Sequence, residues 1–163
     1  MAQTNISVPG NCELRCIFCM NKSNSPVGSN IKYSDLTESV RKAKDNGDDG
    51  ISFGAGNYEP ATYPQIAELI DYSRSLGFDD IDLKTSGMPT ADMNCLSRLV
   101  SAGLTQLSIT FVSSSSEKTD FICGGSKVLD RKNASVKNAL ALGVNVKCDV
   151  ILTADTEDEL PGI

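Results

Sequence analysis

Three closely spaced cysteines near the start of the chain form its clearest reactive motif. The segment NCELRCIFCM gives Cys12-x3-Cys16-x2-Cys19, and its polar neighbours favour a loop over a buried strand. Short spacings of this kind let one loop bring several thiolates around a compact metal centre. On a four-iron cluster, three protein thiolates leave one iron open to a further ligand. The motif therefore predicts an iron–sulfur cofactor that supplies chemistry beyond the reach of side chains.

The other cysteines and the absence of histidine narrow the chemistry further. The chain has six cysteines and no histidine, which excludes Ser-His and Cys-His catalysis and any zinc site that needs imidazole. Cys95 and Cys148 fall inside a predicted helix and a predicted strand, and we expect both to be buried packing residues. Cys123, in the Gly-flanked segment FICGGS, has three open roles: a free thiol, a loop filler or a fourth ligand. The last role corresponds to a non-catalytic zinc or iron–sulfur α/β protein.

Strand-like and helix-like segments alternate along the chain. The predicted strands are residues 5–8, 50–54, 80–84, 104–112 and 144–153. The predicted helices are residues 34–46, 64–76, 90–102 and 126–142, with Ser34 and Thr90 as N-caps, and residues 157–160 open one more helix. Strands that alternate with helices predict a parallel sheet joined by right-handed crossovers.

This α/β pattern contains about five βα units. A closed eight-unit barrel needs roughly 250 residues, more than the 163 present. We therefore expect a parallel partial TIM-like barrel, curved and open, as a single domain over residues 1–163, and a C-terminal truncation is one interpretation of its length. A flat doubly wound sheet is the alternative, because periodicity does not separate the two.

Charge and hydropathy bear on the partners. The net charge is −6, and no stretch concentrates lysine and arginine on one face, which weighs against binding nucleic acid through its phosphates. No apolar run is long enough to cross a membrane, and the N-terminal residues lack the basic-then-apolar order of a secretory signal. We expect a cytoplasmic protein without a membrane partner.

The cysteine motif resembles that of the radical S-adenosylmethionine (radical SAM) enzymes, in which an aromatic residue precedes the last cysteine, as Phe18 does here. The resemblance implies that Cys12, Cys16 and Cys19 bind three irons of a [4Fe–4S] cluster, and that the methionyl group of S-adenosylmethionine (SAM) chelates the fourth. It also implies reductive cleavage of SAM to a 5′-deoxyadenosyl radical, which abstracts hydrogen from a substrate. A cluster with an open iron is expected to be oxygen-sensitive.

A second segment supports the resemblance. After the second predicted strand, the family has a Gly-Gly-Glu-Pro-like motif that holds the SAM amino group, and this chain has GAGNYEP there. The resemblance makes Gly54, Ala55, Gly56 and Glu59 candidates for binding SAM. Glycines allow a close approach of the backbone to a ligand, and the Glu59 carboxylate can accept a hydrogen bond from an ammonium group.

Polar residues at the later strand ends complete the candidate SAM site. Lys84 opens a Lys-Thr-Ser-Gly segment similar to the Thr-Asn-Gly stretch that ends the third strand in this family, and we expect it near the SAM carboxylate or the substrate. Ser108 and Thr110 fall where the fourth strand of the family often contacts the SAM ribose or carboxylate. Ile151 falls where the fifth strand commonly contacts adenine. All these residues belong to the carboxyl ends of the strands, where sites of barrel enzymes lie.

The resemblance implies partners but leaves the substrate open. It implies a low-potential electron donor of the flavodoxin or ferredoxin type, and family barrels with six βα units suggest a partner chain that completes this one. An open barrel mouth without a lid domain favours a peptide or protein substrate over a small metabolite. Two alternatives remain: the non-catalytic metal protein with Cys123 as ligand, and an ordinary α/β binding domain with inert cysteines.

Overall fold

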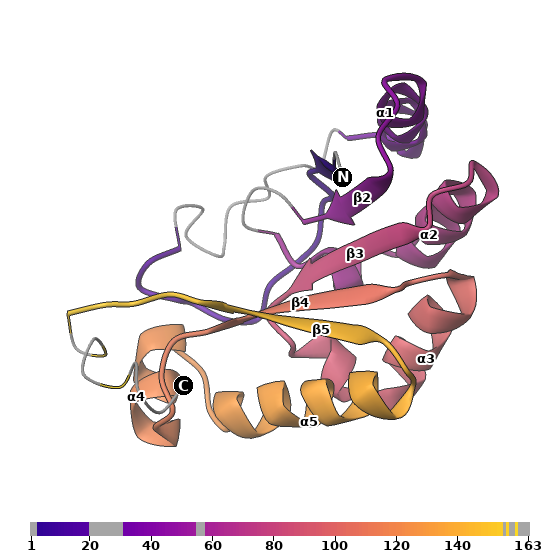
Figure 1. Ribbon diagram of the computed structural model, residues 1–163. Coiled ribbons are helices and arrows are strands. Elements are labelled where there is room, and N and C mark those ends of the chain that lie inside the picture. The colour runs from indigo at the N-terminus through magenta and orange to yellow at the C-terminus, as the bar shows by residue number, and fades with distance from the viewer. Residues whose placement is uncertain (1–2, 20–30, 55–57, 155, 157–158, 160–163) are drawn as a thin grey trace.

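The computed structural model describes residues 3–19, 31–54, 58–154, 156 and 159, and in this part of the chain five parallel strands form one sheet (Figure 1). The strands are β1 Gln3–Ile6, β2 Gly50–Phe53, β3 Asp80–Thr85, β4 Gln106–Phe111 and β5 Asn145–Val150. They pair in the order β1-β2-β3-β4-β5. All four ladders are parallel, and they bring Ile6, Phe53 and Leu83 into register.

The consecutive strand order identifies the sheet as part of a barrel. Right-handed crossovers between neighbouring strands place every connecting helix on the same face, whereas a doubly wound sheet reverses its order and has helices on both faces. Figure 1 shows α1, α2, α3 and α5 following one another along the outer side of the curved sheet. The helices are α1 Tyr33–Asp45, α2 Ile66–Ser75, α3 Met93–Ala102, α4 Ser116–Cys123 and α5 Val128–Ala141, with short 3-10 turns at Pro60–Thr62 and Pro89–Ala91. The prediction of a partial TIM-like barrel is confirmed.

The two faces of the sheet have different chemistry. Successive side chains of a strand point to opposite faces, and the outward ones are large, apolar and fully buried against the helices: Ile51, Phe53, Ile81, Leu83, Leu107 and Ile109. Burial of each such side chain contributes roughly 1.5–3 kcal/mol. On the inner face, Asp82 accepts hydrogen bonds from the Ser52 hydroxyl at 2.7 Å and the Ser108 hydroxyl at 2.8 Å. The inner face is therefore polar, and it leads to the carboxyl ends of the strands.

Two helix caps differ from the prediction. The first helix begins one residue before Ser34, and the N–H of Lys32 donates to the Asp35 carboxylate at 3.2 Å. Thr90 lies within the 3-10 turn Pro89–Ala91, and Asp92 caps α3 by accepting from the N–H two residues further on, at 2.8 Å. In α3 the Asp92 carboxylate thus makes the cap bond expected of the Thr90 hydroxyl, whereas in α1 Asp35 binds back to the N–H of the N-cap residue. Both carboxylates also interact favourably with the helix dipole.

The predicted helix over residues 126–142 is α5 alone, and α4 precedes it. The short α4 has a polar first turn and a weak apolar periodicity, so its pattern does not stand out from a loop. Ser115 caps it by accepting a hydrogen bond from the N–H of Lys118 at 3.4 Å, and Gly124 ends it in the left-handed conformation. Cys123 is thus the last residue of a helix rather than a loop residue. The predicted opening of a helix at 157–160 lies largely outside the described residues.

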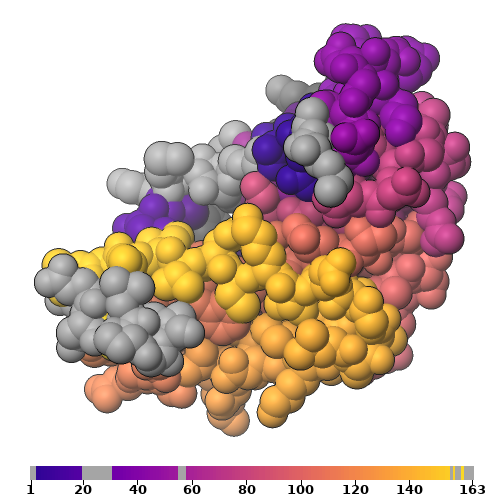
Figure 2. Space-filling view, viewed as in Figure 1, coloured from indigo at the N-terminus to yellow at the C-terminus, as the bar shows by residue number. Residues whose placement is uncertain are grey.

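The burial of two cysteines was predicted incorrectly. Cys95 is only half-buried on α3, and Cys148 is exposed on β5. Cys148 is exposed because β5 is an edge strand: within the described part of the chain no strand pairs with its free edge. Figure 2 shows the surface of β5, in yellow, uncovered on the front of the molecule. None of the described helices is long and apolar enough to cross a membrane.

Candidate active site

A cavity of about 470 Å³ lies at the carboxyl ends of the strands and gathers most of the predicted site. The residues from the sequence prediction that line it are Cys12, Cys16, Phe18, Cys19, Gly54, Glu59, Lys84, Thr110 and Ile151. Ser108 does not line the cavity, because its hydroxyl is bound to Asp82 deeper on the inner face. Ala55 and Gly56 lie outside the described residues. The cavity thus joins the cysteine loop to the ends of several strands, as the βα order predicts.

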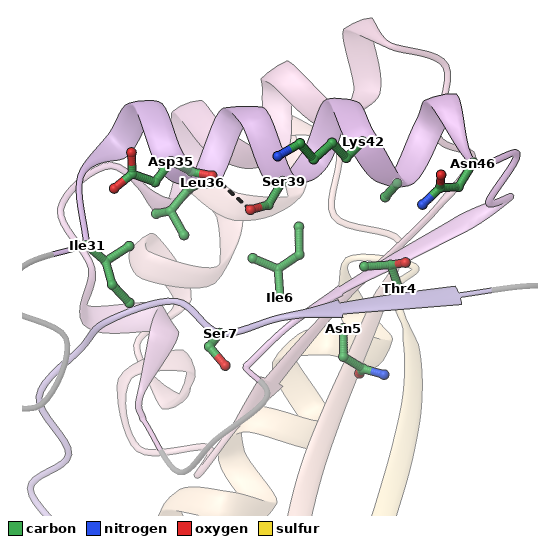
Figure 3. Close-up of a pocket in the computed structure, with 11 residues that line it drawn as sticks. Thr4, Asn5, Ile6, Ser7, Ile31, Asp35, Leu36, Ser39, Lys42 and Asn46 are labelled. Carbon is green, nitrogen blue, oxygen red and sulfur yellow. Dashed lines mark hydrogen bonds between the residues drawn. The ribbon is translucent and has the colours of Figure 1, made fainter.

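A second cavity, of about 440 Å³, lies between the free edge of β1 and α1 (Figure 3). Figure 3 shows Ile6 and Leu36 pointing into the space beneath α1, while Asn5 and Ser7 point to the other side of β1. Ser39 on its helical wall donates its hydroxyl hydrogen to the carbonyl of Asp35 at 2.8 Å. None of the cysteines and none of the strand-end candidates lines this space. It is an edge seam of the core, and the chemistry belongs to the first cavity.

The cysteine loop is held by the end of α4. The N–H of Arg15 donates to the carbonyl of Cys123 at 2.9 Å, and the N–H of Ile17 donates to that of Ile122 at 2.9 Å. These carbonyls are among those that a helix leaves unpaired at its C-terminus. Gly124 follows with φ +61, and a Cβ there would lie 3.0 Å from the carbonyl oxygen of Arg15. The FICGGS segment is therefore the platform on which the cysteine loop rests.

The thiols near this platform influence one another. Burial raises the pKa of Cys12, and a hydrogen bond with the Cys123 side chain, together with burial, raises the pKa of Cys16. The same hydrogen bond, helped by the Lys132 ammonium, lowers the pKa of Cys123 to about 7. The side chains of Cys16 and Cys123 are therefore close enough for each to shift the pKa of the other. Cys123 therefore lies beside Cys16, at the end of α4.

Zinc sites and iron–sulfur clusters need different arrangements of donors. Among the residues that the structure describes, no three cysteine or acidic side chains converge closely enough to hold a single metal ion. A tetrahedral zinc site needs four donors within about 2.3 Å of one point. A four-iron cluster instead binds each thiolate to a different iron and so holds its ligands farther apart. Three cysteines that line one cavity supply the three thiolates of a four-iron cluster with one open iron.

Glu59 is occupied differently from the prediction. One carboxylate oxygen accepts from the Thr85 hydroxyl at 2.6 Å and the N–H of Ala61 at 3.4 Å, and the other accepts from the N–H of Ser86 at 2.8 Å and from the Ser86 hydroxyl. Burial raises the pKa of Glu59, and the hydrogen bonds from Ser86 and Thr85 oppose that rise. The four hydrogen bonds occupy about all the acceptor positions that a carboxylate has. Glu59 ties the turn after β2 to the end of β3.

Lys132 is the functional residue that the sequence did not indicate. It lies on α5 and is 2 % exposed, and its Nζ lines the cavity while donating to the carbonyls of Ser86 at 2.8 Å and Thr110 at 2.6 Å. Burial lowers the pKa of this ammonium, and the nearby Cys123 and Cys16 thiols oppose that effect. A lysine in the middle of a helix is ordinarily a surface residue, and only the tertiary structure shows that this one reaches the site.

The remaining predicted residues occupy the rim of the cavity. Lys84 donates from Nζ to the side-chain oxygen of Asn5 at 2.9 Å, which fixes the lysine at the mouth between β1 and β3. Phe18 and Ile151 are partly buried against a small hydrophobic core that lies beneath the cysteine loop and includes Leu14. The site therefore has an apolar wall near the cysteines and a polar rim at the strand ends.

Comparison with known proteins assigns the family. The model of the Radical SAM superfamily matches residues 6–161. The chain belongs to the radical SAM superfamily. Among curated relatives, 7,8-dihydro-6-hydroxymethylpterin dimethyltransferase of Methanocaldococcus jannaschii is 27% identical over 98% of this chain and 32% of its own length. The probable GTP 3′,8-cyclase of Methanothermobacter marburgensis is 28% identical over 93% of this chain and 48% of its own length. The radical SAM chain thus spans between about a third and a half of these relatives.

Solved structures share its fold. Streptococcus suis SuiB superposes with a TM-score of 0.75 at 19% identity, over 98% of this chain and 35% of its own. The protein described as native anSMEcpe with bound AdoMet superposes with a TM-score of 0.65 at 18% identity, over 90% of this chain and 43% of its own. The radical SAM family uses a [4Fe–4S] cluster and SAM. These are therefore the cofactors of this chain. The three free thiols on one loop of the cavity fit that cofactor set.

Proposed function

We propose that this chain is the SAM-binding part of a radical SAM enzyme in which Cys12, Cys16 and Cys19 hold the cluster. The observation that carries the proposal is that all three thiols and the ends of β2, β3 and β4 line one cavity. When bound, the cluster and SAM supply the electron and the 5′-deoxyadenosyl radical for hydrogen abstraction. The protein's part is to bind and orient these groups and to exclude water from them.

The rim residues have separate roles in this proposal. Phe18 and Ile151 offer apolar surface to the adenosine moiety, since both line the cavity and are partly buried. Lys84, fixed by Asn5, supplies a positive charge for the SAM carboxylate. Gly54 and Thr110 line the cavity with little side-chain bulk, which lets a ligand approach the strand ends. Glu59 positions these strand ends and does not itself contact SAM.

The proposed enzyme needs a reductant and more protein than this chain. A low-potential donor of the flavodoxin or ferredoxin type would deliver the electron. The free edge of β5 and the exposure of Val150 and Leu152, at 38% and 46%, favour a further βα unit beside it. The fact that this chain spans about a third to a half of its curated relatives supports the same idea. We propose that a further segment of the protein or a partner chain covers β5.

A peptide or protein is the first candidate substrate. The open mouth of the cavity, at the carboxyl ends of the strands, would admit an extended chain. SuiB, with a TM-score of 0.73 to this chain in that structure, has been crystallised with the precursor peptide SuiA, and at 19% identity this likeness shows only that such a fold accommodates a peptide. A reduced pterin or a guanine nucleotide is the second candidate, because the curated relatives at 27% and 28% identity are named for such substrates.

Deuterium transfer separates the two substrate classes. We expect the reduced protein, given SAM and a deuterated substrate of the right class, to form 5′-deoxyadenosine that carries deuterium. The reaction is run in parallel with a deuterated peptide pool, deuterated GTP and a deuterated reduced pterin. The deuterium content of the 5′-deoxyadenosine is then measured by mass spectrometry. Label from GTP or the pterin but not from the peptide pool would reject the peptide proposal.

Cysteine substitutions separate the radical SAM site from a four-cysteine metal site. Cys12→Ala should reduce the iron content after anaerobic reconstitution from about four per chain to less than about one, because the cluster loses one of three protein ligands. Cys123→Ala should retain most of the iron, since Cys123 supports the loop and is no ligand. The exposed Cys148→Ala is the control and should behave as the wild type. If Cys123→Ala loses as much metal as Cys12→Ala, the non-catalytic alternative is correct.

A further inference from the structure

Lys132 carries a charge that its surroundings do not neutralise. The residue is 2 % exposed, and among the described residues no carboxylate lies within ion-pair distance of its Nζ. Its hydrogen bonds go to two backbone carbonyls, those of Ser86 and Thr110. Buried charges in proteins are ordinarily paired with an opposite charge or bound to a metal. This ammonium therefore has no direct ion-pair partner among the described residues, and the Glu59 carboxylate acts on it only from a longer distance.

The position of Lys132 is fixed by the backbone. The two carbonyls belong to the segment after β3 and to β4, so the ammonium bridges neighbouring strand ends across the floor of the cavity. The turn after β3 lies directly against the lysine, because a Cβ on Gly87 would be in ordinary contact with the Lys132 Cγ at 3.4 Å. The Phe111 ring lies 5.7 Å from the Nζ and adds a weak attraction. A charge held in this way is oriented before any ligand arrives.

The anion that fits this position is the cluster. Lys132 lines the same cavity as the three cysteines of the loop. The Cys123 and Cys16 side chains act on its charge more strongly than the Glu59 carboxylate and Cys12 do. A four-iron cluster with three thiolate ligands is negatively charged, and one-electron reduction makes it more so. A nearby fixed cation therefore stabilises the reduced cluster more than the oxidised one. Local charge is one of the factors that set the potential of such clusters.

We propose that Lys132 is a positioning residue that acts as the built-in counter-charge of the cluster and raises its reduction potential. The proposal rests on the proposed function, because it requires the cluster on Cys12, Cys16 and Cys19. Lys132 thereby gives α5 an electrostatic role in the redox step. The cluster can then accept an electron from a weaker reductant. Lys84 is directed to the rim by Asn5, so the two lysines of the cavity have different roles.

The test compares the potentials of reconstituted clusters without SAM or substrate. Lys132→Met removes the charge at similar volume, Lys132→Gln retains donors for the carbonyls, and Lys132→Arg retains the charge. Lys137→Met, at an exposed position of the same helix, is the control.

Each protein is titrated with dithionite at controlled potential, and the reduced cluster is quantified by electron paramagnetic resonance. We expect the Met and Gln variants to show about a tenfold lower ratio of reduced to oxidised cluster at a fixed potential, which is about 59 mV for one electron. The Arg variant and the control should stay within about twofold of the wild type, well inside that tenfold effect.

Every other outcome also decides the question. If the Met and Gln variants bind full iron and titrate within twofold of the wild type, the proposal is wrong. If Lys132→Arg shifts as far as Lys132→Met, geometry and not charge is responsible, and the proposal is also wrong. If the neutral variants fold by circular dichroism but load no cluster, loading by Lys132→Arg supports the counter-charge and its failure rejects it. Failure of the wild type itself to load iron would instead reject the proposed function.

Discussion

Replacing Gly10 with alanine should destabilise the protein by at least about 3 kcal/mol, the upper part of the usual range for overpacking. A Cβ at this position would lie 2.0 Å from the carbonyl oxygen of Glu59 and 3.0 Å from the Thr62 hydroxyl. The backbone has no room to withdraw, because Asn11 donates its N–H to that hydroxyl at 2.8 Å. Gly10 precedes the cysteine loop directly, so the clash also displaces the loop from the turn after β2. Urea denaturation measures the first effect, and the iron content after reconstitution measures the second.

Gly47→Ala is the matched control for this experiment. Gly47 has φ +83, but nothing lies within 4 Å of the Cβ that alanine would add. The expected cost is therefore only that of the left-handed conformation, about 1 kcal/mol. Equal losses of stability in the two variants would show that the packing of Gly10 against Glu59 does not hold the loop.

Replacing Glu59 with alanine should cost about 3 kcal/mol of folding free energy and disorder the rim of the cavity. The substitution leaves the Thr85 hydroxyl, the Ser86 hydroxyl and the Ser86 N–H without their acceptor, and each such buried group costs about 1–3 kcal/mol. The Thr85 and Ser86 positions also support the carbonyl that binds Lys132. Thermal and urea denaturation of the apoprotein measure the loss without reference to the cofactor.

Two further substitutions show that the loss belongs to this network. Glu68→Ala removes an exposed glutamate from α2 and should change stability by less than about 0.5 kcal/mol. Ser86→Ala removes one of the donors to Glu59 and should cost about 1 kcal/mol, near the mean for one hydrogen bond. If Glu59→Ala is as mild as Glu68→Ala, the carboxylate is not the clamp between the turn after β2 and the end of β3.

The sequence predicted the fold and the rim of the site because both depend on local patterns. Period-two and period-3.6 runs mark strands and helices, and parallel strands place their carboxyl ends at one edge. Cys12, Lys84 and Ile151, far apart along the chain, therefore meet at one cavity. Ser108 was misplaced because a shift of two residues along a strand changes depth without changing the face, and Thr110 occupies the rim instead.

The residues that the sequence did not indicate owe their roles to tertiary contacts. Lys132 stands in an ordinary helical pattern, and its burial depends on the approach of α5 to the ends of β3 and β4. Glu59 was assigned to an ammonium partner, but Thr85 and Ser86, which come from a different βα unit, occupy its carboxylate. The short helix α4 carries too weak a pattern to predict, although it forms the platform for the cysteine loop.

The most direct test of the proposed function is cysteine-dependent formation of 5′-deoxyadenosine. The wild-type protein and Cys19→Ala are reconstituted anaerobically with iron and sulfide, reduced with dithionite and incubated with SAM. The account predicts about four irons per chain and 5′-deoxyadenosine for the wild type, and neither for the variant. A wild-type protein that binds no iron, or that forms 5′-deoxyadenosine as well after Cys19 is replaced, would contradict it.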